Sequence, residues 1–521
     1  MGLLRSASVF SSLTLVSRVF GMIRDQIIAI VFGASAGLDA FWVAFKIPNF
    51  MRRLFAEGAF SQGFVPVLGE YKVKQGDVAV RDLISRVAGS LAVVVLGITI
   101  VSMVLFPWLI LHYGPKAITN QHKLVLTAQM LVLTLPYILF ISLTSLSGGV
   151  LNTYKRFAIP AFTPVFLNLC MIGAALFLAP YMPPGDQVKA LAWGVLLAGM
   201  VQLGFQIPFL AKLGFLAWPR WGFNDPGVQR IMRLMGPAIL GSMVVQINLT
   251  VDLLVAYVVL PDGSVSWLTY SDRLVEFPLG VFGIAISTVI LPSLSQHHAK
   301  TDSHEFSKTL DWGLRWALLI ALPATAGLVM LAGPLLTTLF NYGAFKQHDV
   351  LMAQMSLFAY ASGLLAFIMI KVLAPAFYSR QDTRTPVRIA VRAMIANLVF
   401  IAVLVIPWVH FGYPAPHTGL ALATSLSAYG NAIMLFVTLH RQKVYHRMPG
   451  WGHFLMQVGG ALLMMLAVLI FAVPGLSHWL GWSAGHRALM LLVWVSVCAA
   501  TYFVGLYLFG FRLGTFRAQQ A

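Results

Sequence analysis

The stretch from Asp39 to Tyr71 is apolar enough to enter a membrane, yet its first half is rich in ionisable side chains. These residues are Asp39, Lys46, Arg52, Arg53 and Glu57. An ionisable group at the bilayer centre costs roughly 2.5–3.5 kcal/mol, so a span that carries several must face protein or water. An arginine guanidinium stays charged and binds phosphate or carboxylate through two parallel hydrogen bonds. The pattern therefore predicts a helix that lines a hydrated, anion-binding cavity.

Two further predicted spans carry clusters of arginine and acidic residues. They hold Arg18, Arg24 and Asp25 near the N-terminus, and Asp272, Arg273 and Glu276 in the second half of the chain. Because arginine is the preferred residue for binding phosphate, the guanidinium groups favour an anion site. The arginines that we expect to bind the anion are Arg18, Arg24, Arg52 and Arg273.

Internal salt bridges are the alternative interpretation of these charges, above all for the acids. Arg24 with Asp39 and Arg273 with Glu276 are two pairs that would lock helices together. The spacing also leaves one orientation open. Pro48 can kink the helix, so the sequence does not decide whether Arg52 or Arg53 points inward.

The composition predicts an all-α integral membrane protein. Of 521 residues, 59% are hydrophobic and 10% are charged, against about 25% charged in an average soluble domain. Long apolar runs without ten-residue alternation select helices over a membrane barrel. The net charge of +18 does not indicate nucleic-acid binding, because most lysines and arginines fall in alternate connections, as topology demands. That asymmetry predicts that both termini are cytoplasmic.

Windows of about 19 residues predict fourteen transmembrane helices. They centre on 10–32, 37–64, 83–111, 124–150, 159–180, 188–210, 229–259, 266–295, 309–332, 350–376, 387–408, 417–438, 453–473 and 487–509.

The first twelve spans fall into two similar halves. FVPVL around Pro66 recurs as ILPSL around Pro292, and LNTYKRFAIP ending at Pro160 recurs as FYSRQDTRTP ending at Pro386. An even number of spans per half makes the two halves parallel. We therefore expect an N-lobe (1–225), a C-lobe (226–448) and two extra C-terminal helices (449–521), with the substrate site between the lobes.

Other sequence features concern a coupling ion and catalytic activity. Asp252 is a lone carboxylate in its span, which suggests a cation or proton site with Asn397 and Thr424. No phosphate-binding loop of the ATPase type, no metal-ligand spacing and no nucleophile with a base can be found, so we expect a transporter rather than an enzyme, without a cofactor.

Several motifs together resemble the MurJ (MviN) family of lipid II flippases, within the MOP (multidrug/oligosaccharidyl-lipid/polysaccharide) exporter superfamily. The resemblance covers essentially the whole chain. It is carried above all by SRVFGMIRD (17–25), DAFWVAFKIPNFMRRLFAEGAFSQGFVPVLGEYK (39–72), YSDRLVEFPLGVFGIA (270–285) and KVLAPAFYSRQDTRTPV (371–387).

The resemblance implies a function. Such a flippase moves lipid II, an undecaprenyl-pyrophosphate-linked MurNAc-pentapeptide with GlcNAc, from the inner to the outer leaflet of the bacterial inner membrane for peptidoglycan and cell wall synthesis. Its required charges match Arg18, Arg24, Asp39, Arg52, Asp272, Arg273 and Glu276 here, with Asn49 and Glu57 in the same motif. The family also implies a groove for the lipid tail in 449–521. The cell-wall synthesis machinery is a candidate partner.

The driving force is a separate question. Asp252 and Asn397 match a sodium site of some family members, although Ile401 offers no oxygen one turn further on. An inside-negative membrane potential, worth about 2.3 kcal/mol per charge per 100 mV, would also drive an anionic head group outward. An ion-coupled multidrug antiporter and a flippase of another pyrophosphate-linked oligosaccharide are the alternative functions.

Overall fold

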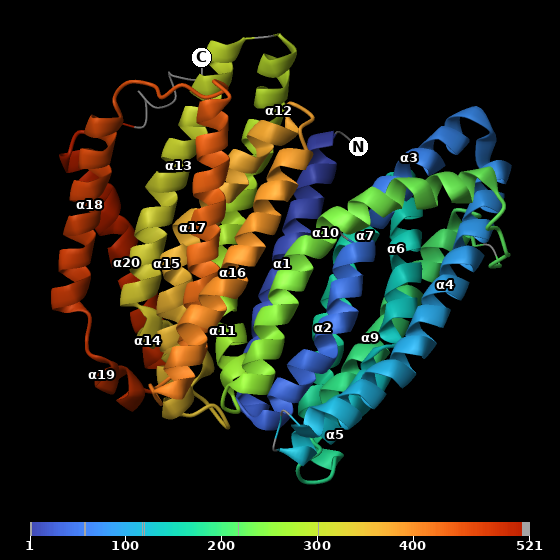
Figure 1. Cartoon of the computed structure of the whole chain (residues 1–521), viewed down its shortest axis with the longest axis horizontal. Coiled ribbons are helices and arrows are strands. Elements are labelled where there is room, and N and C mark those ends of the chain that lie inside the picture. The colour runs from blue at the N-terminus through green and yellow to red at the C-terminus, as the bar shows by residue number, and fades with distance from the viewer. Residues whose placement is uncertain are drawn as a thin grey trace. The chain divides into compact units, whose positions relative to one another are not determined.

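The computed structural model describes residues 3–56, 59–116, 118, 120–216, 218–300 and 302–512. In this part of the chain every regular element is a helix (Figure 1). The long helices are α1 (Leu3–Phe32), α2 (Ala36–Ala56), α3 (Ala59–Lys74), α4 (Gly76–Tyr113), α5 (Gln121–Thr134), α6 (Tyr137–Thr153), α8 (Pro164–Gly173), α9 (Lys189–Lys212), α10 (Pro226–Val259), α11 (Ser264–Pro278), α12 (Ile284–Ala299), α13 (Ser303–Met330), α15 (Gln347–Tyr378), α16 (Arg384–His410), α17 (His417–Arg441), α18 (Trp451–Ala472) and α20 (Ala484–Leu508). The short ones are η1 (Gly114–Lys116), α7 (Ala158–Phe162), η2 (Ala174–Leu178), η3 (Ala179–Tyr181), η4 (Leu279–Gly283), α14 (Ala332–Phe340) and α19 (Leu476–Gly481).

The membrane class expected from composition is confirmed. Among the described residues, eleven helices are long and apolar enough to cross a bilayer, when α5 with α6, α7 through η3, and α11 through α12 are each counted as one helix. The predicted spans 10–32, 37–64 and 229–259 are not among the eleven; they fall on α1, on α2 with α3, and on α10. The first two of these carry several ionisable residues, and parts of 37–64 and of 229–259 lie outside the residues whose side chains the structure describes. The total of fourteen spans therefore stays a prediction.

Prolines divide two of the predicted spans into shorter helices. The span 124–150 consists of α5 and α6, which are separated by Leu135 and Pro136. Proline lacks the N–H that would continue the helical hydrogen bonds, so the helix breaks there. In the span 266–295, α11 ends at Pro278 and is followed by a π-helical turn, Leu279–Gly283, before α12. Both spans are therefore interrupted at or beside a proline of their own sequence.

The described chain separates into two compact units, residues 1–266 and 267–521. In the first unit, α10 packs along α3 and also contacts α2 and α4. The sequence NDPG starts α10: the Asp225 carboxylate accepts hydrogen bonds from the N–H groups of Gly227 and Val228, and Pro226 occupies the first turn. The expected lobe boundary at 225–226 rests on internal repetition, which compactness does not test, so it stays a prediction.

In the second unit, α15 packs against α17 and α13, and the hairpin of α18 and α20 packs beside α13 (Figure 1). Buried residues of the hairpin, among them Val458, Met465 and Tyr502, form one apolar cluster with Leu319 of α13. Gly505 allows the hairpin helices to approach closely, since a Cβ there would lie 2.8 Å from the Cα of Ala461. The C-terminal helices are therefore an integral part of this unit.

A buried polar network fastens the hairpin to α13. The Asp311 carboxylate accepts hydrogen bonds from the Tyr445 hydroxyl and the Trp451 indole N–H, both at 2.7 Å, and pairs with Arg315 Nε at 2.8 Å. Arg315 Nη2 donates to the carbonyl of Pro449 at 2.7 Å. Burial and the neighbouring Asp311 carboxylate raise the pKa of Tyr445 well above its ordinary value, so the hydroxyl remains a neutral donor.

We expect Asp311→Ala to destabilise the second unit strongly, because it leaves the buried Arg315 charge without its carboxylate. Removal of one partner of a buried pair costs about 3–5 kcal/mol. The control is Glu305→Ala on the same helix, whose carboxylate forms a partly exposed pair with Lys308 that is worth about 1 kcal/mol or less. The melting temperature of the purified protein should fall clearly for Asp311→Ala and little for Glu305→Ala. Equal melting temperatures would contradict the structural role of Asp311.

Candidate functional site

The candidate site residues lie on helices of both compact units. The first unit contains Arg18 and Arg24 on α1, Asp39, Asn49 and Arg52 on α2, and Asp252 on α10. The second unit contains Asp272, Arg273 and Glu276 on α11, and Asn397 on α16. Glu57 lies outside the described residues, as does the side chain of Arg53. The convergence of both sets on one cavity stays a prediction.

Arg24 is the most deeply buried guanidinium of the set, with 5% of its surface exposed. Its Nε and Nη2 lie 2.9 and 2.6 Å from Oδ1 of Asp25, and Nη1 donates to Oδ1 of Asn168 at 3.1 Å. Asn168 in turn donates to the carbonyl of Ser17, so it connects α8 to α1 at two residues, Ser17 and Arg24. The pairing offsets the cost of burying the charge and fixes the position of the guanidinium.

Arg18 lies on α1 about one and two-thirds turns before Arg24, and its side chain is exposed. Both arginines are on the same continuous helix, so their spacing along the axis is set at about 9 Å by the rise per residue. The helix therefore carries one guanidinium that is hydrogen-bonded and buried, that of Arg24, and one that is exposed, that of Arg18.

On α2, Asn49 and Arg52 form a local pair. The Nε and Nη2 atoms of Arg52 both lie 3.1 Å from Oδ1 of Asn49, three residues earlier on the same helix. Pro48 lies inside the helix directly before this pair, where it removes a backbone hydrogen bond. Both side chains are partly buried. Because the side chain of Arg53 is not described, the choice between Arg52 and Arg53 as the inward residue stays open.

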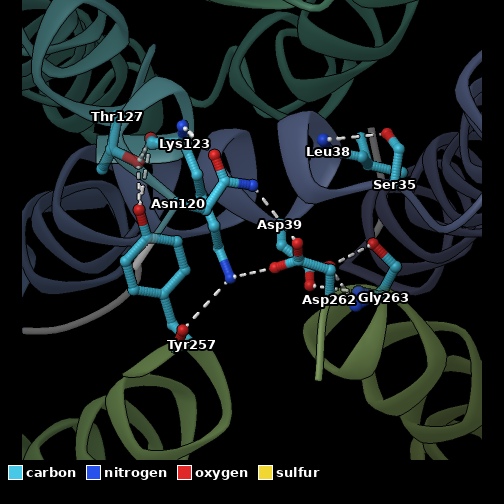
Figure 2. A network of polar contacts seen from close by, with 10 residues as sticks. Ser35, Leu38, Asp39, Asn120, Lys123, Thr127, Tyr257, Asp262 and Gly263 are labelled. Atoms are coloured by element: carbon cyan, nitrogen blue, oxygen red, sulfur yellow. Dashed lines mark hydrogen bonds and ion pairs between the residues drawn. The ribbon is translucent and has the colours of Figure 1, made fainter. Parts of the chain in front are cut away.

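Asp39 holds the first turn of α11, as Figure 2 shows in part. Its Oδ2 accepts the N–H of Gly263 at 2.7 Å, and its Oδ1 accepts the N–H of Ser266 at 2.9 Å and the Ser266 hydroxyl at 2.7 Å. These are the N–H groups just before the helix and at its third position, which have no partner within α11. One carboxylate from α2 therefore caps α11, and its charge is favourable at a helix N-terminus.

The sequence explains why α11 needs a cap from another helix. It is preceded by Pro261-Asp262-Gly263, and Gly263 has no side chain with which to cap the helix. The φ angle of Gly263 is +94°, in the left-handed region that glycine adopts without strain. Asp39 is fully buried, so its carboxylate depends on these three hydrogen bonds in place of water.

On α11 in the second unit, Arg273 and Glu276 form an ion pair, with Arg273 Nη1 at 2.9 Å from Glu276 Oε2. Both side chains are partly exposed, and Asp272 beside them is exposed. Of the two pairings considered from the sequence, Arg273 with Glu276 is therefore present, whereas Arg24 pairs with Asp25. Such a pair between residues one turn apart is weak when exposed, so a competing anion can replace it.

The candidate cation residues are both buried, but they belong to different units. Asp252 is on α10 in the first unit, and Asn397 is on α16 in the second. Thr424 donates its hydroxyl to the carbonyl of Leu420. Among the described residues no three His, Cys, Asp or Glu side chains are grouped as metal ligands. A monovalent cation site at Asp252 and Asn397 stays a prediction.

The sequence analysis did not predict two residues that support the site, Asn168 and Lys123. In the sequence, Asn168 is a polar residue in an apolar predicted span, and Lys123 directly precedes another predicted span. A polar amide in the middle of VFLNLC is a usable signal, because an amide in a membrane span requires hydrogen-bond partners. Nothing in the sequence places Lys123 near the start of α11.

Comparison with known proteins identifies the family. The family model described as "Lipid II flippase MurJ" matches residues 28–492. A protein of Vibrio cholerae named "Probable lipid II flippase MurJ" is 46% identical, over 99% of this chain and 98% of that protein. A protein of Burkholderia cenocepacia named "Lipid II flippase MurJ" is 40% identical, over 99% of each chain.

Solved structures agree with the sequence relatives. A lipid II flippase MurJ in an inward closed conformation has a TM-score of 0.78 and 25% identity, and the match covers 96% of this chain and 98% of that one. A multidrug resistance MATE family transporter of the MOP superfamily has a TM-score of 0.66 at 14% identity, over 84% of this chain and 98% of that one, which shows a shared fold alone. The match to the family model over most of the chain, together with relatives of high identity over nearly their full length, establishes that this chain belongs to the MurJ family of lipid II flippases.

Proposed function

We propose that this chain is a lipid II flippase, which carries the undecaprenyl-pyrophosphate-linked peptidoglycan precursor from the inner to the outer leaflet of the bacterial inner membrane. Membership of the MurJ family along the whole chain supports this function. So do the helices that can cross a membrane. The proposed protein is a transporter without enzymatic chemistry, in which both termini are cytoplasmic.

The observation that carries the proposal is the presence of arginines on helices of a membrane protein. Arg18 and Arg24 on α1, Arg52 on α2 and Arg273 on α11 each place a permanent positive charge where the chain is otherwise apolar. A pyrophosphate is the anionic group of lipid II that can use several guanidinium groups at once. We assign these four arginines to binding of the pyrophosphate.

The acids and the amide complete the proposed substrate site. Asp272, Glu276, Asn49 and Glu57 lie within one or two turns of an arginine in the sequence. Where contacts are described, they hold a guanidinium, as Asn49 holds Arg52 and Glu276 holds Arg273. Arrival of a pyrophosphate would exchange these partners for phosphate oxygens. Binding would therefore cost little electrostatic free energy, because each guanidinium group exchanges one hydrogen-bond partner for another.

Asp39 contributes to the same cycle by a different contact. It joins α2 to the first turn of α11, the helix that carries Arg273. Alternating access requires contacts that form in one state and break in another. We assign the Asp39 cap to this class of contact, beside its expected place in the substrate site.

The driving force that we propose is the membrane potential, with a monovalent cation at Asp252 and Asn397 as a second contribution. An inside-negative potential favours outward movement of an anionic head group and inward return of an empty, positively charged site. The peptidoglycan synthesis machinery, which consumes the product, is the proposed partner. The likeness to drug transporters shows the fold alone and so does not favour drug efflux.

We expect Arg24→Ala and Arg273→Ala to reduce outward transport of lipid II about tenfold to hundredfold, since each loses a charge-assisted contact of about 1.5–3 kcal/mol. The measurement is the lipid II exposed outside cells in which this chain is the sole flippase, at matched membrane levels. Arg230→Ala is the control, because its guanidinium is exposed and pairs with Glu70. Equal transport in all three variants would disprove pyrophosphate binding by these arginines.

We expect graded effects at Asp39. Asp39→Ala removes three hydrogen bonds, and Asp39→Asn keeps one acceptor oxygen without the charge, so transport should decrease in the order wild type, Asn, Ala. Ser35→Ala, which removes only the contact with the N–H of Leu38 at the start of α2, is the control. Retention of wild-type transport by Asp39→Ala would show that the cap has no part in the cycle.

We expect collapse of the membrane potential to lower lipid II transport. The experiment dissipates the potential at constant sodium and pH, and follows outward transport in cells or vesicles. A matched arm removes sodium at constant potential, which separates the cation contribution from the electrical one. An unchanged rate without potential would remove the potential as a driving force.

A further inference from the structure

Lys123, in the first turn of α5, is buried inside the first unit with 2% of its surface exposed. A buried ammonium group is costly unless it is paired. Its Nζ lies 2.7 Å from Oδ1 of Asp262, donates to the carbonyl of Tyr257 at 3.2 Å and lies 4.3 Å from the centroid of the Tyr257 ring. All these partners are on the last turn of α10 or in the loop after it.

Other side chains of the same region support the contact. Asn120 caps α5 by accepting the N–H of Lys123, and it donates its amide to Oδ2 of Asp262 at 3.4 Å. The Thr127 hydroxyl bonds to the hydroxyl of Tyr257 at 2.5 Å and to the carbonyl of Lys123 at 2.8 Å. The start of α5 therefore holds the end of α10 by several contacts, all visible in Figure 2.

The position of Lys123 matches the electrostatics of α10. The carbonyl of Tyr257 belongs to the last turn of that helix, whose carbonyl groups have no helical N–H partner. A positive charge is favourable at a helix C-terminus, just as a negative charge is favourable at an N-terminus. Lys123 thus donates to a carbonyl group at the end of α10. Only a few residues further along the chain, Asp39 accepts an N–H group at the start of α11.

The two contacts meet on neighbouring residues. The side chain of Asp262 is held by Lys123, and the N–H of the next residue, Gly263, is held by Asp39. Because one peptide unit joins these residues, fixing the Asp262 side chain limits the directions in which the Gly263 N–H can point. Loss of the Lys123 contact must therefore loosen the Asp39 cap as well.

We propose that Lys123, through Asp262 and the Tyr257 carbonyl, is a positioning residue for the Asp39 cap on α11. The pair forms one electrostatic joint between α10 and α11, with a cation on the end of the first helix and an anion on the start of the second. The link to transport rests on the proposed function, whereas the joint itself is a property of the first unit and can be tested without transport.

The test uses a cysteine at Ser264 as the reporter. Ser264 is fully buried in the first turn of α11, and its hydroxyl has no hydrogen-bond partner, so Ser264→Cys changes little. Cys170 and Cys498 are replaced by alanine to remove other thiols. In the full-length protein in lipid nanodiscs, Lys123→Met should raise the rate of labelling by a small maleimide at least fivefold. The control is Lys189→Met, which breaks the 2.6 Å pair between Lys189 and Asp186, three residues earlier in the chain. This variant should leave the labelling rate unchanged within about twofold.

A milder variant protects the test against misfolding. Asp262 is 46% exposed, so Asp262→Asn should fold normally and still raise the labelling rate. If the two residues act through one contact, the double variant Lys123→Met/Asp262→Asn should be labelled no faster than Lys123→Met alone. Multiplicative effects, or an unchanged rate in Lys123→Met with a normal melting temperature, would overturn the proposal.

Transport separates this inference from the proposed function. Lys123→Met should reduce lipid II transport at least fivefold, whereas Lys189→Met should not. Faster labelling with undiminished transport would overturn the positioning role of Lys123 in the cycle. Absence of lipid II transport in the wild-type chain would overturn the proposed function, and the labelling rates would then decide the joint alone.

Discussion

A charge inside a membrane protein keeps its place only while water or a partner of opposite polarity surrounds it. Three buried cations of the described structure meet this constraint with specific partners. Arg24 has Asp25 and Asn168, Arg315 has Asp311 and a carbonyl, and Lys123 has Asp262 and another carbonyl. Each of these cations is therefore also a tie between segments that are distant in the sequence. The same groups that make the chain expensive to insert hold its helices together once they are inserted.

Helix ends serve the same purpose as charged side chains. A glycine directly precedes α11, which depends on a carboxylate from α2 for its cap, while an ammonium group from α5 binds the end of α10. Caps of this kind differ from ordinary caps, which come from the helix's own sequence, as Asp225 provides for α10. A cap from another helix links the stability of one helix to the position of a second. That linkage makes a helix terminus suitable as a contact that a transport cycle can break and form again.

The sequence predicted the fold class, the approximate position of most spans and the family, because hydropathy and long motifs are local properties. It also predicted the pair of Arg273 with Glu276, which are one helical turn apart. Contacts between distant segments could not be predicted in this way. The partners of Asp39 are Gly263 and Ser266, more than two hundred residues away, and nothing in their local sequence marks them as partners of an acid. The lobe boundary and the meeting of the charges in one cavity remain predictions, since they concern the arrangement of two units that the structure describes separately.

The network around Asp311 has an evolutionary consequence. Tyr445, Pro449 and Trp451, which satisfy Asp311 and Arg315, all lie in or beside the last hairpin. A twelve-helix transporter without this hairpin would lack the equivalent of Trp451, so an acid and a base on the equivalent of α13 would have fewer buried partners than Asp311 and Arg315 have here. We therefore expect the buried acid and base on α13 to occur together with the hairpin among related transporters.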